Sequence, residues 1–365
     1  MSQKVKAAVL HTPDSSFSIQ EVELAELQPG EVRVKVEASG VCHTDIFARH
    51  HVSTPSVLGH EGVGIIEETG PGVDNFQVGQ RVIISYPWCD DCAVCRNNRP
   101  WLCENLLPLC FGGARLDGSK TISLEGTPIS SAFFQQSSFA SHAITLARDI
   151  VSVDEDVAPA ILAALPCGIQ TGAGAIMNSF SMEKGQSLLV IGAGAVGLSA
   201  VMAAVIVGAS PIIVADIHDS RLSLAKDLGA DYSINVKDPG LVLGCSDIIP
   251  GGVDYILDTS GREESMLNGF QCLAREGTLG IVTTPDEGLP NFELDELFLR
   301  GASLQGIIQG SSIPGNFIPR LIEYYRDGRF PVDRLVKTYP FAEINRAIDD
   351  SLSGETIKPV LVMPD

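Results

Sequence analysis

Residues 187–200 read SLLVIGAGAVGLSA, and they decide the fold of the second half of the chain. The first five residues predict a short buried strand, and the small apolar residues of 195–207 favour a helix. A G-x-G-x-x-G turn at 192–197 joins the two, and the next predicted strand, 211–216, ends in Asp216. A glycine-rich turn between a strand and a helix, with an acidic residue one strand later, is typical of a dinucleotide-binding unit.

Each glycine of the turn has a physical role in this interpretation. Gly192 permits the tight bend, Gly194 leaves room for a pyrophosphate at the helix N-terminus, and Gly197 lets the helix pack closely on the strand. We therefore predict that the cofactor is held by Gly192, Gly194, Val196 and Gly197. Asp216 is expected to bind the adenosine ribose hydroxyls and to repel a 2′-phosphate, which favours NAD. Arg221 is close enough in sequence to assist a phosphate, so NADP stays open, as does a purely structural glycine turn.

The remaining sequence divides into two patterns. After residue 158 an amphipathic helix at 219–228 and buried strands at 252–258 and 277–283 continue the alternation of strand and helix, which predicts a doubly wound parallel sheet. The first third is rich in strands, with few helical patterns. Its predicted strands are 4–10, 17–24, 31–38, 62–68 and 81–85. The C-terminal segment predicts helices at 317–326 and 341–352 and a strand at 358–362.

Length and composition narrow the class of protein. A chain of 365 residues is long enough for two domains. The net charge of −20 disfavours nucleic acid as a partner, because phosphate binding needs clustered lysines and arginines. Apolar runs are interrupted by Gly and Ser, so no membrane span is predicted. The nine cysteines and the absence of a recognisable export signal favour reduced thiols and a cytoplasmic location.

Four cysteines are concentrated in the segment 89–103. Cys89, Cys92, Cys95 and Cys103 follow the pattern C-x2-C-x2-C-x7-C. Four thiolates can close a tetrahedral site with no open position, which indicates a structural zinc ion that orders its own loop. Free cysteines or an iron–sulfur cluster are the alternatives.

A second set of candidate metal ligands is dispersed along the chain. Cys42, His60 and Cys167 would supply two thiolates and one imidazole, leaving a fourth tetrahedral position for a water or substrate oxygen. Spacing alone does not unite them, since each could equally be a buried residue of no chemical role.

Taken together, these features resemble the zinc-containing alcohol dehydrogenases of the medium-chain dehydrogenase/reductase superfamily along essentially the whole chain. The shared landmarks are Gly59-His60-Glu61 followed by Gly62 and Gly64, the four-cysteine loop, Cys167, the glycine turn and Asp216. The resemblance implies a GroES-like, mostly β catalytic domain over 1–168 and 309–365 and a Rossmann NAD-binding domain over 169–308. It also implies two zinc ions per chain, NAD as cofactor, and hydride transfer between an alcohol and an aldehyde or ketone.

The resemblance also assigns roles to single residues. Cys42, His60 and Cys167 would bind the catalytic zinc, Glu61 would lie beside it, and Asp45 would orient the ring of His60. Thr44 would pass the substrate proton to the nicotinamide ribose, unless it is only a helix N-cap. His43 and Lys358 match pyrophosphate contacts of the family, and Thr171 a residue beside the nicotinamide. Further cofactor contacts are expected at Thr259, Val282 and Ile307.

Shorter runs are similar to the benzyl and aryl alcohol dehydrogenases. They are 111–118, 136–140 and 167–174, and they suggest a primary aryl, benzylic or cyclic allylic alcohol as substrate, including intermediates of secondary metabolism. Ser85 stands where some relatives have a bulky aromatic wall, which predicts a roomier pocket, with Tyr86, Trp88 or Phe111 as alternative walls.

One position departs from the family. Many members carry a histidine five residues after the first zinc ligand, at the outer end of a proton relay, and here Phe47 occupies it. Phenylalanine cannot accept a proton. The proton would leave through the cofactor ribose and water, or through His50 or His51.

Two other functions are compatible with the same fold. A zinc-free reductase acting on quinones or enones would lack complete cysteine sets, and a non-enzymatic NAD-binding protein need not retain an open metal site or Thr44. By the habit of the family we expect a homo-oligomer, either a dimer or a tetramer.

Overall fold

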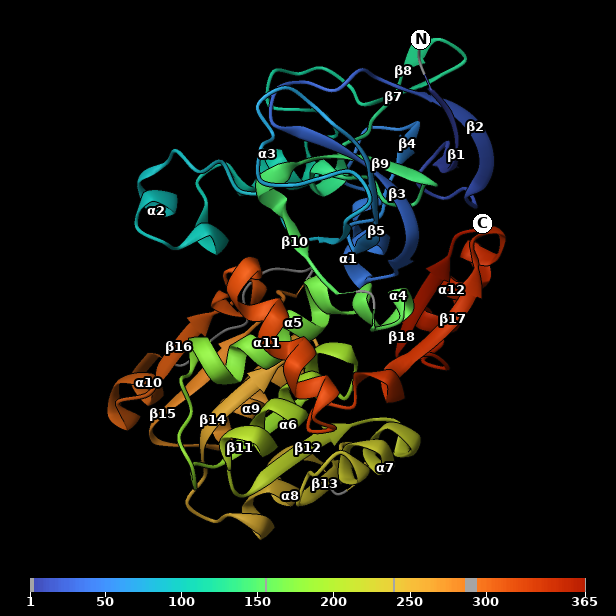
Figure 1. Cartoon of the computed structure of the whole chain (residues 1–365). Helices are drawn as coiled ribbons and strands as arrows, with labels where there is room; N and C mark the ends of the chain where they lie inside the picture. Colours follow the sequence, from blue (N-terminus) through green and yellow to red (C-terminus); the bar gives the residue numbers. More distant parts are fainter. Residues whose placement is uncertain (1–2, 155, 239, 286–293, 365) are drawn as a thin grey trace. The chain divides into compact units, whose positions relative to one another are not determined.

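The computed structural model describes residues 3–154, 156–238, 240–285 and 294–364 and divides the chain into two compact units (Figure 1). The first unit comprises Met1–Cys167, Ile313–Ile322 and Val332–Asp365. The second comprises Gly168–Ser312 and Glu323–Pro331. Each has its own sheets and its own hydrophobic core.

The second unit is built on a parallel sheet of six strands in the order β13-β12-β11-β14-β15-β16. The strands are β11 (Leu188–Ile191), β12 (Ile212–Asp216), β13 (Tyr232–Asn235), β14 (Val253–Asp258), β15 (Leu273–Ile281) and β16 (Ser303–Gly306). This is the Rossmann order, in which the direction of winding reverses between the first and fourth strands and ligands bind at the reversal. The predicted doubly wound parallel sheet is confirmed.

Helices connect these strands. They are α6 (Ala195–Val207), α7 (Asp219–Asp227), α8 (Leu241–Ile248), α9 (Glu263–Gln271) and α10 (Leu294–Arg300). The sequence predicted α6 and α7, but not the other three. Helix α6 is apolar, and its first turn packs so closely on the glycine turn that a side chain on Gly197 would collide with the carbonyl of Gly192.

The first unit contains two β-sheets. One has five strands in the order β4-β1-β2-β7-β8, and the other has seven, with β9 paired to β3 beside the path β10-β6-β5-β3-β18-β17. Their bounds are β1 Gln3–Leu10, β2 Ser18–Leu24, β3 Glu31–Gly40, β4 Ser56–Val57, β5 Gly62–Thr69, β6 Arg81–Ile84, β7 Ile122–Leu124, β8 Thr127–Pro128, β9 His142–Leu146, β10 Ile150–Ser152, β17 Val336–Pro340 and β18 Lys358–Val362. The six predicted strands of this unit are confirmed, whereas β4, β7 to β10 and β17 were not predicted, because most are too short to show a period.

The helices of the first unit are short. Their bounds are α1 His43–Ala48, α2 Ala93–Arg96, η1 Pro100–Leu102, α3 Leu106–Phe111, η2 Phe133–Gln135, η3 Ala147–Asp149, η7 Val332–Leu335, η8 Phe341–Glu343 and α12 Ile344–Leu352. Helix α11, Pro314–Arg326, and the turn η6, Gln309–Ser311, complete the chain. The two predicted C-terminal helices correspond to α11 and to η8 with α12.

The C-terminal strand is part of the sheet that carries the N-terminal segment. Strand β18 runs antiparallel to β3, with Val360 opposite Gly40, and the backbone N–H of Val41 donates to the carbonyl of Pro359 over 2.9 Å. This pairing brings Lys358 next to the residues that follow β3, although more than 300 residues separate them in sequence.

A helical run that the sequence did not predict covers Pro159–Ser179. It consists of α4 (Pro159–Leu162), a π-helical turn η4 (Leu165–Ile169), α5 (Gln170–Gly174) and η5 (Ala175–Ser179). The run is long and apolar enough to cross a membrane, but 78% of its most apolar window is buried inside the protein. A helix that is buried to this extent is typical of the core of a folded protein.

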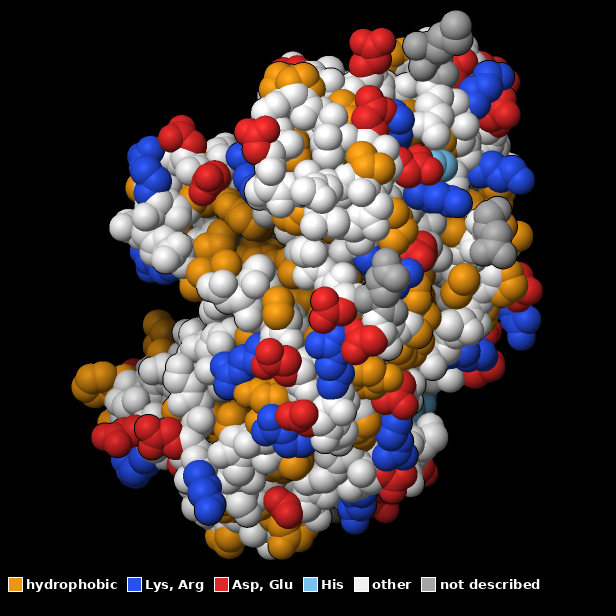
Figure 2. Space-filling model, in the orientation of Figure 1, with side chains coloured by type: hydrophobic (Ala, Val, Ile, Leu, Met, Phe, Trp, Pro, Cys, Tyr) orange, Lys and Arg blue, Asp and Glu red, His pale blue; other side chains and the backbone are white. Residues whose placement is uncertain are grey.

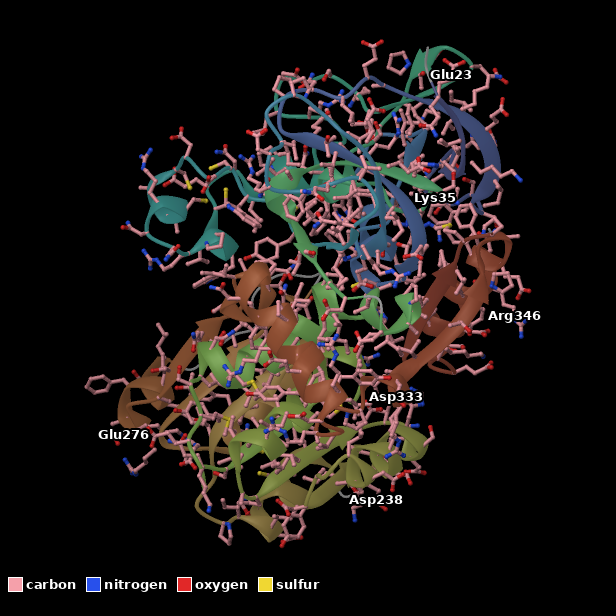
Figure 3. The ribbon with its side chains drawn as sticks, in the orientation of Figure 1. Glu23, Lys35, Asp238, Glu276, Asp333 and Arg346 are labelled. Atoms are coloured by element: carbon pink, nitrogen blue, oxygen red, sulfur yellow. The ribbon has the colours of Figure 1, made fainter. Side chains whose placement is uncertain are left out.

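The surface carries many charged side chains. Asp238, Glu276 and Asp333 are exposed and labelled in Figure 3, in keeping with the net charge of −20. Figure 2 shows hydrophobic side chains at the surface over α10, where Leu294, Phe298 and Leu299 are 71%, 82% and 67% exposed.

Candidate active site and metal centres

The dispersed metal-ligand candidates meet in the first unit. One ligand atom from each of Cys42, His60, Glu61 and Cys167 can be chosen so that all lie within 4.8 Å of one another, and the two sulfurs are 4.0 Å apart. The fold thus brings together three residues that sequence spacing could not unite.

Local structure explains how each ligand is presented. Cys42 lies two residues after the end of β3 and is the N-cap of α1, so its side chain lies at the start of the helix. His60 follows Gly59, whose φ of 93° and contact with Phe139 leave no space for a side chain. Cys167 lies in the π-helical turn η4, a kind of irregularity that often occurs at functional sites.

Asp45 connects two of the ligands. Its Oδ1 accepts hydrogen bonds from Nδ1 of His60 at 2.8 Å and from the N–H of Gly59 at 3.2 Å, while Oδ2 accepts from the N–H of Cys42 at 2.9 Å. The carboxylate is buried, and it fixes the tautomer of His60 by holding the proton on Nδ1. Nε2 of His60 is buried and has no hydrogen-bond partner within the part of the chain that the structure describes.

These observations fit a metal ion. A buried imidazole nitrogen without a partner, facing two thiols, matches a tetrahedral zinc site with one position left for another ligand. A hydrogen bond from Cys167 lowers the pKa of Cys42 well below its ordinary value, and the charge of Lys358 acts in the same direction. A thiolate is the form of cysteine that binds metals.

Glu61 and Lys358 form a buried ion pair beside the ligands. Lys358 is 2% exposed; its Nζ contacts Oε2 of Glu61 and lies 3.5 Å from the carbonyl of Val41. Burial raises the pKa of Glu61 to about 7 against the opposing charge of Lys358. The pairing was not anticipated, since the sequence suggested a pyrophosphate contact for Lys358.

Aromatic rings cover the side of His60. Its imidazole lies 4.5 Å from the ring centre of Phe134 and 5.7 Å from that of Phe133, and Phe111 packs on both. Phe47 meets Phe111 edge to face at 6.2 Å and is 47% exposed. The rings therefore form a continuous series from the metal ligand to the protein surface.

The candidates for proton transfer lie on and after α1. Oγ1 of Thr44 is 3.7 Å from Sγ of Cys42. Because Cys42 is the N-cap, the alternative that Thr44 only caps the helix is wrong. His43 is exposed at the first position of the helix. His51 stacks on Phe47 with ring centres 3.7 Å apart and donates from Nδ1 to the carbonyl of Phe47.

Ser85 is fully buried behind the third ligand. Its hydroxyl donates to the carbonyl of Pro166 over 3.4 Å, directly before Cys167. Tyr86 is also buried, with its ring 5.8 Å from that of Trp88.

The four-cysteine loop gathers its sulfurs in a separate cluster of the first unit. Ligand atoms of Cys89, Cys92, Cys95 and Cys103 lie within 4.8 Å of one another. Backbone N–H groups point at these sulfurs, from Cys92 to Cys89 and from Cys89 to Cys103, both at 3.3 Å. Such donors stabilise thiolates, so the cluster fits the closed site predicted from its spacing.

The glycine turn of the second unit is held by two side chains. Thr259 Oγ1 donates to the carbonyls of Ile191 and Gly192, and Oδ2 of Asp216 accepts from the N–H of Ala193 over 2.7 Å. Gly192 has a φ of 97°, which favours glycine. A side chain on Gly194, the N-cap of α6, would meet open space, and this space suits a phosphate at the helix N-terminus.

The other predicted cofactor residues also belong to the second unit, apart from His43 and Lys358. Thr171 lies on α5, Val196 at the start of α6 and Arg221 on α7. Val282 and Ile307 directly follow β15 and β16 at the carboxyl end of the sheet, the edge at which Rossmann folds bind ligands.

Comparison with known proteins identifies the family. Residues 28–152 match the alcohol dehydrogenase GroES-like domain, and residues 195–324 match the zinc-binding dehydrogenase family. The chain belongs to the zinc-type alcohol dehydrogenases of the medium-chain dehydrogenase/reductase superfamily, and it is an oxidoreductase of alcohols. The resemblance, the GroES-like and Rossmann fold classes and the enzymatic class predicted from the sequence are confirmed.

Three relatives cover nearly the whole chain. A geraniol dehydrogenase of Castellaniella defragrans is 39% identical over 98% of this chain and 97% of its own. A solved alcohol dehydrogenase zinc-binding domain protein from Burkholderia ambifaria is 42% identical, with a TM-score of 0.97 and complete coverage of both chains. A solved benzyl alcohol dehydrogenase from Acinetobacter calcoaceticus is 40% identical, with a TM-score of 0.96, covering 99% of this chain and 100% of its own.

Several residues at the site were missed by the sequence interpretation. The rings of Phe133 and Phe134 and the amide of Gln136 all contact His60, and the sequence interpretation gave none of the three a role. The run 136–140 carried a similarity to the benzyl and aryl alcohol dehydrogenases, but the Phe-Phe-Gln-Gln run at 133–136 has no helical or strand period from which these contacts could be predicted.

Proposed function

We propose that this enzyme interconverts a primary aryl, benzylic or cyclic allylic alcohol and its aldehyde with NAD(H) and zinc. The observation that carries the proposal is the convergence of Cys42, His60 and Cys167 beneath a series of aromatic rings. The fold supplies the metal ligands and the apolar surface within one unit.

Each residue at the metal centre has a role in this proposal. Cys42, His60 and Cys167 would hold a catalytic zinc, and Cys89, Cys92, Cys95 and Cys103 would hold a structural one, giving two per chain. When bound, zinc supplies Lewis acidity at its open position, and nicotinamide supplies a hydride acceptor. Asp45 keeps the proton of His60 on Nδ1, so that Nε2 stays available to a metal. Glu61, neutralised by Lys358, supplies a carboxylate beside the ligands.

Proton transfer would begin at Thr44, whose hydroxyl can accept a proton from an alcohol while donating its own. Phe47 cannot continue such a relay, and its ring stacks against His51. The stack holds the imidazole of His51 against the ring that occupies the position of a histidine in many relatives. We propose that the proton leaves through His50 or His51, or through the cofactor ribose and water.

Cofactor preference follows from the second unit. The turn of Gly192, Gly194, Val196 and Gly197 would receive the pyrophosphate, and the negative charge of Asp216 disfavours the 2′-phosphate of NADP. Further cofactor contacts in the proposal are His43, Thr171, Arg221, Thr259, Val282, Ile307 and Lys358. Thr259 would act mainly through the backbone of the turn, because its hydroxyl already donates to Gly192.

The aromatic rings support the substrate class. Planar alcohols with a π system pack edge to face or offset against phenylalanine rings, gaining more than their buried area alone provides. Phe47, Phe111, Phe133 and Phe134 offer such faces next to His60. The names of two relatives, geraniol dehydrogenase and benzyl alcohol dehydrogenase, also denote alcohols with an adjacent π system.

One edge of the second unit bears on the oligomeric state of the protein. Strand β16 is an edge of the parallel sheet, and α10 beside it exposes Leu294, Phe298 and Leu299. An exposed strand edge next to exposed apolar side chains favours association with another chain. We propose a homo-oligomer, in the cytoplasm.

An assay of NADH absorbance with benzyl alcohol, cinnamyl alcohol, 1-cyclohexenylmethanol and 1-butanol, run in parallel with NAD and NADP, tests the function. We expect turnover of the first three with NAD and about two zinc ions per chain by metal analysis. Turnover of enones or quinones without bound zinc would instead identify a zinc-free reductase. Bound zinc and NAD with no turnover across alcohols and aldehydes would identify a non-enzymatic binding protein.

A further inference from the structure

The segment 132–137 has an unusual backbone. Ala132, Phe134, Gln135 and Ser137 all have positive φ values, between 49° and 58°, although none is a glycine. Such conformations are disfavoured and persist only where the surroundings fix them. Here Ser137 Oγ donates to the carbonyl of Val57 over 2.6 Å and accepts from the N–H of Phe133. Backbone strain of this kind is concentrated at functional sites. The contacts that this segment makes with its neighbours are therefore of interest for the metal centre.

The segment contacts His60 in two ways. The rings of Phe133 and Phe134 pack on its imidazole, and the side-chain amide of Gln136 binds its backbone. Gln136 is 2% exposed; its Nε2 donates to the carbonyl of His60 at 3.0 Å and to that of Ser85 at 3.3 Å. Its Oε1 accepts from the N–H of Gly62 at 3.0 Å. One amide thus binds the backbone on both sides of Glu61.

We propose that Gln136 is a positioning residue that fixes the orientation of His60 and Glu61 toward the sulfurs of Cys42 and Cys167. The proposal rests on the proposed function of this site. A rotation of either peptide group around Glu61 would turn its carboxylate away from Lys358 and turn the imidazole relative to the thiols. The amide opposes both rotations because its donor and its acceptor are engaged simultaneously.

The backbone contacts cannot be replaced by packing alone. A side chain on Gly62 would collide with Ser138, so the start of β5 packs closely against the segment that carries Gln136. Without Gln136, the carbonyl of His60 and the N–H of Gly62 would lose these buried partners.

The neighbouring residue provides a matched control. Gln135 is also buried and also carries an amide, but its Nε2 donates to the carbonyls of Leu109, Ala114 and Ala132. Within the described part of the chain, these side-chain hydrogen bonds do not involve residues 60–62. Substituting either glutamine by methionine keeps length and volume while removing the amide.

The test compares purified Gln136→Met and Gln135→Met by kcat, KM, zinc content, and the visible absorption spectrum of the enzyme with cobalt replacing zinc. For Gln136→Met we expect kcat to fall about 10- to 100-fold and the cobalt bands to shift, as for other residues that orient metal ligands. Gln135→Met should keep kcat within about threefold and an unshifted spectrum, even if its thermal midpoint falls equally. If Gln136→Met does not fold, Gln136→Asn takes its place in the comparison, because the shorter asparagine side chain cannot reach both backbone groups.

Two results would overturn the proposal: wild-type kcat and spectrum in a folded Gln136 variant, or equal losses in both glutamine variants. The cobalt spectrum and zinc content do not require turnover. If the wild type binds zinc but oxidises no alcohol, the proposed function fails, while the shifted spectrum still decides the role of Gln136.

Discussion

Asp45 accepts a hydrogen bond from Nδ1 of His60 over 2.8 Å, and the same carboxylate caps the helical turn that begins at Cys42. One buried side chain therefore sets the orientation of two candidate ligands that come from different parts of the sequence. Its third donor, the N–H of Gly59, fixes the backbone that presents His60. Loss of the carboxylate should disturb the metal centre more than the fold.

We predict that Asp45→Asn lowers zinc affinity or kcat/KM by about 10- to 100-fold, because an amide of similar size cannot hold the proton of His60 as firmly as a carboxylate. Metal analysis after dialysis and steady-state kinetics measure the two effects. Asp117→Asn changes an exposed carboxylate of the same unit and serves as the control. Unchanged zinc binding and kinetics in Asp45→Asn would contradict the role assigned to this residue.

The four-cysteine loop gives a second prediction, about stability. Cys95→Ser should leave about one zinc ion per chain and lower the free energy of unfolding by about 3 kcal/mol or more, since loss of a structural metal is among the severe mutational mechanisms. Urea unfolding and metal analysis measure both. Cys110→Ala is the matched control, because Cys110 is a buried cysteine outside the cluster and should leave both ions bound. Two bound ions in Cys95→Ser would refute the assignment.

The sequence predicted the nucleotide-binding half of the fold better than the metal site. The strand, glycine turn and helix at 187–207 carry local signals, and the structure matches them to within one residue. The helical run Pro159–Ser179 was missed because it is apolar on all sides and has no amphipathic period. The ion pair of Glu61 and Lys358 depends on the pairing of β3 with β18, a long-range contact that no local pattern encodes.

Asp216 provides a prediction about cofactor choice. Its Oδ2 accepts from the N–H of Ala193, so removing the side chain would disturb the glycine turn as well as the charge. Asp216→Asn keeps an acceptor and removes only the charge. We expect the ratio of kcat/KM for NAD to that for NADP to fall at least tenfold, equivalent to about 1.4 kcal/mol. Asp219→Asn, which removes a carboxylate at the start of α7, is the control. An unchanged ratio in Asp216→Asn would show that this charge does not select the cofactor.

Asp149 provides a prediction about pH. Its side chain is fully buried, and burial raises its pKa to about 8, an effect that Arg148, 3.8 Å away, only partly opposes. The unfolded carboxyl titrates near pH ~4, so the folded state retains a proton that the unfolded state has lost between pH ~4 and ~8. The stability that this proton provides is therefore complete below pH ~4 and is lost as pH rises, by at most about 1.4 kcal/mol per pH unit.

Asparagine resembles the protonated carboxyl in size and charge. We predict that Asp149→Asn gains at least about 2 kcal/mol of stability relative to the wild type between pH 5 and pH 9, measured by urea unfolding at both values. An equal stability difference at the two pH values would mean that Asp149 is ionised in the folded protein throughout this range.

The series of rings that ends at Phe47 gives the final prediction, about substrate. Phe47→Leu and Phe111→Leu remove an aromatic face while keeping an apolar side chain, and Phe47 is exposed enough that its substitution should not affect folding. Contacts between aromatic rings contribute about 0.5–1.5 kcal/mol beyond buried area, so kcat/KM for benzyl alcohol should fall roughly 2- to 10-fold in each variant. The same variants assayed with 1-butanol provide the internal control, since a saturated chain gains nothing from a ring face. If both alcohols lose equally, the rings act only in packing, and another part of the first unit selects the substrate.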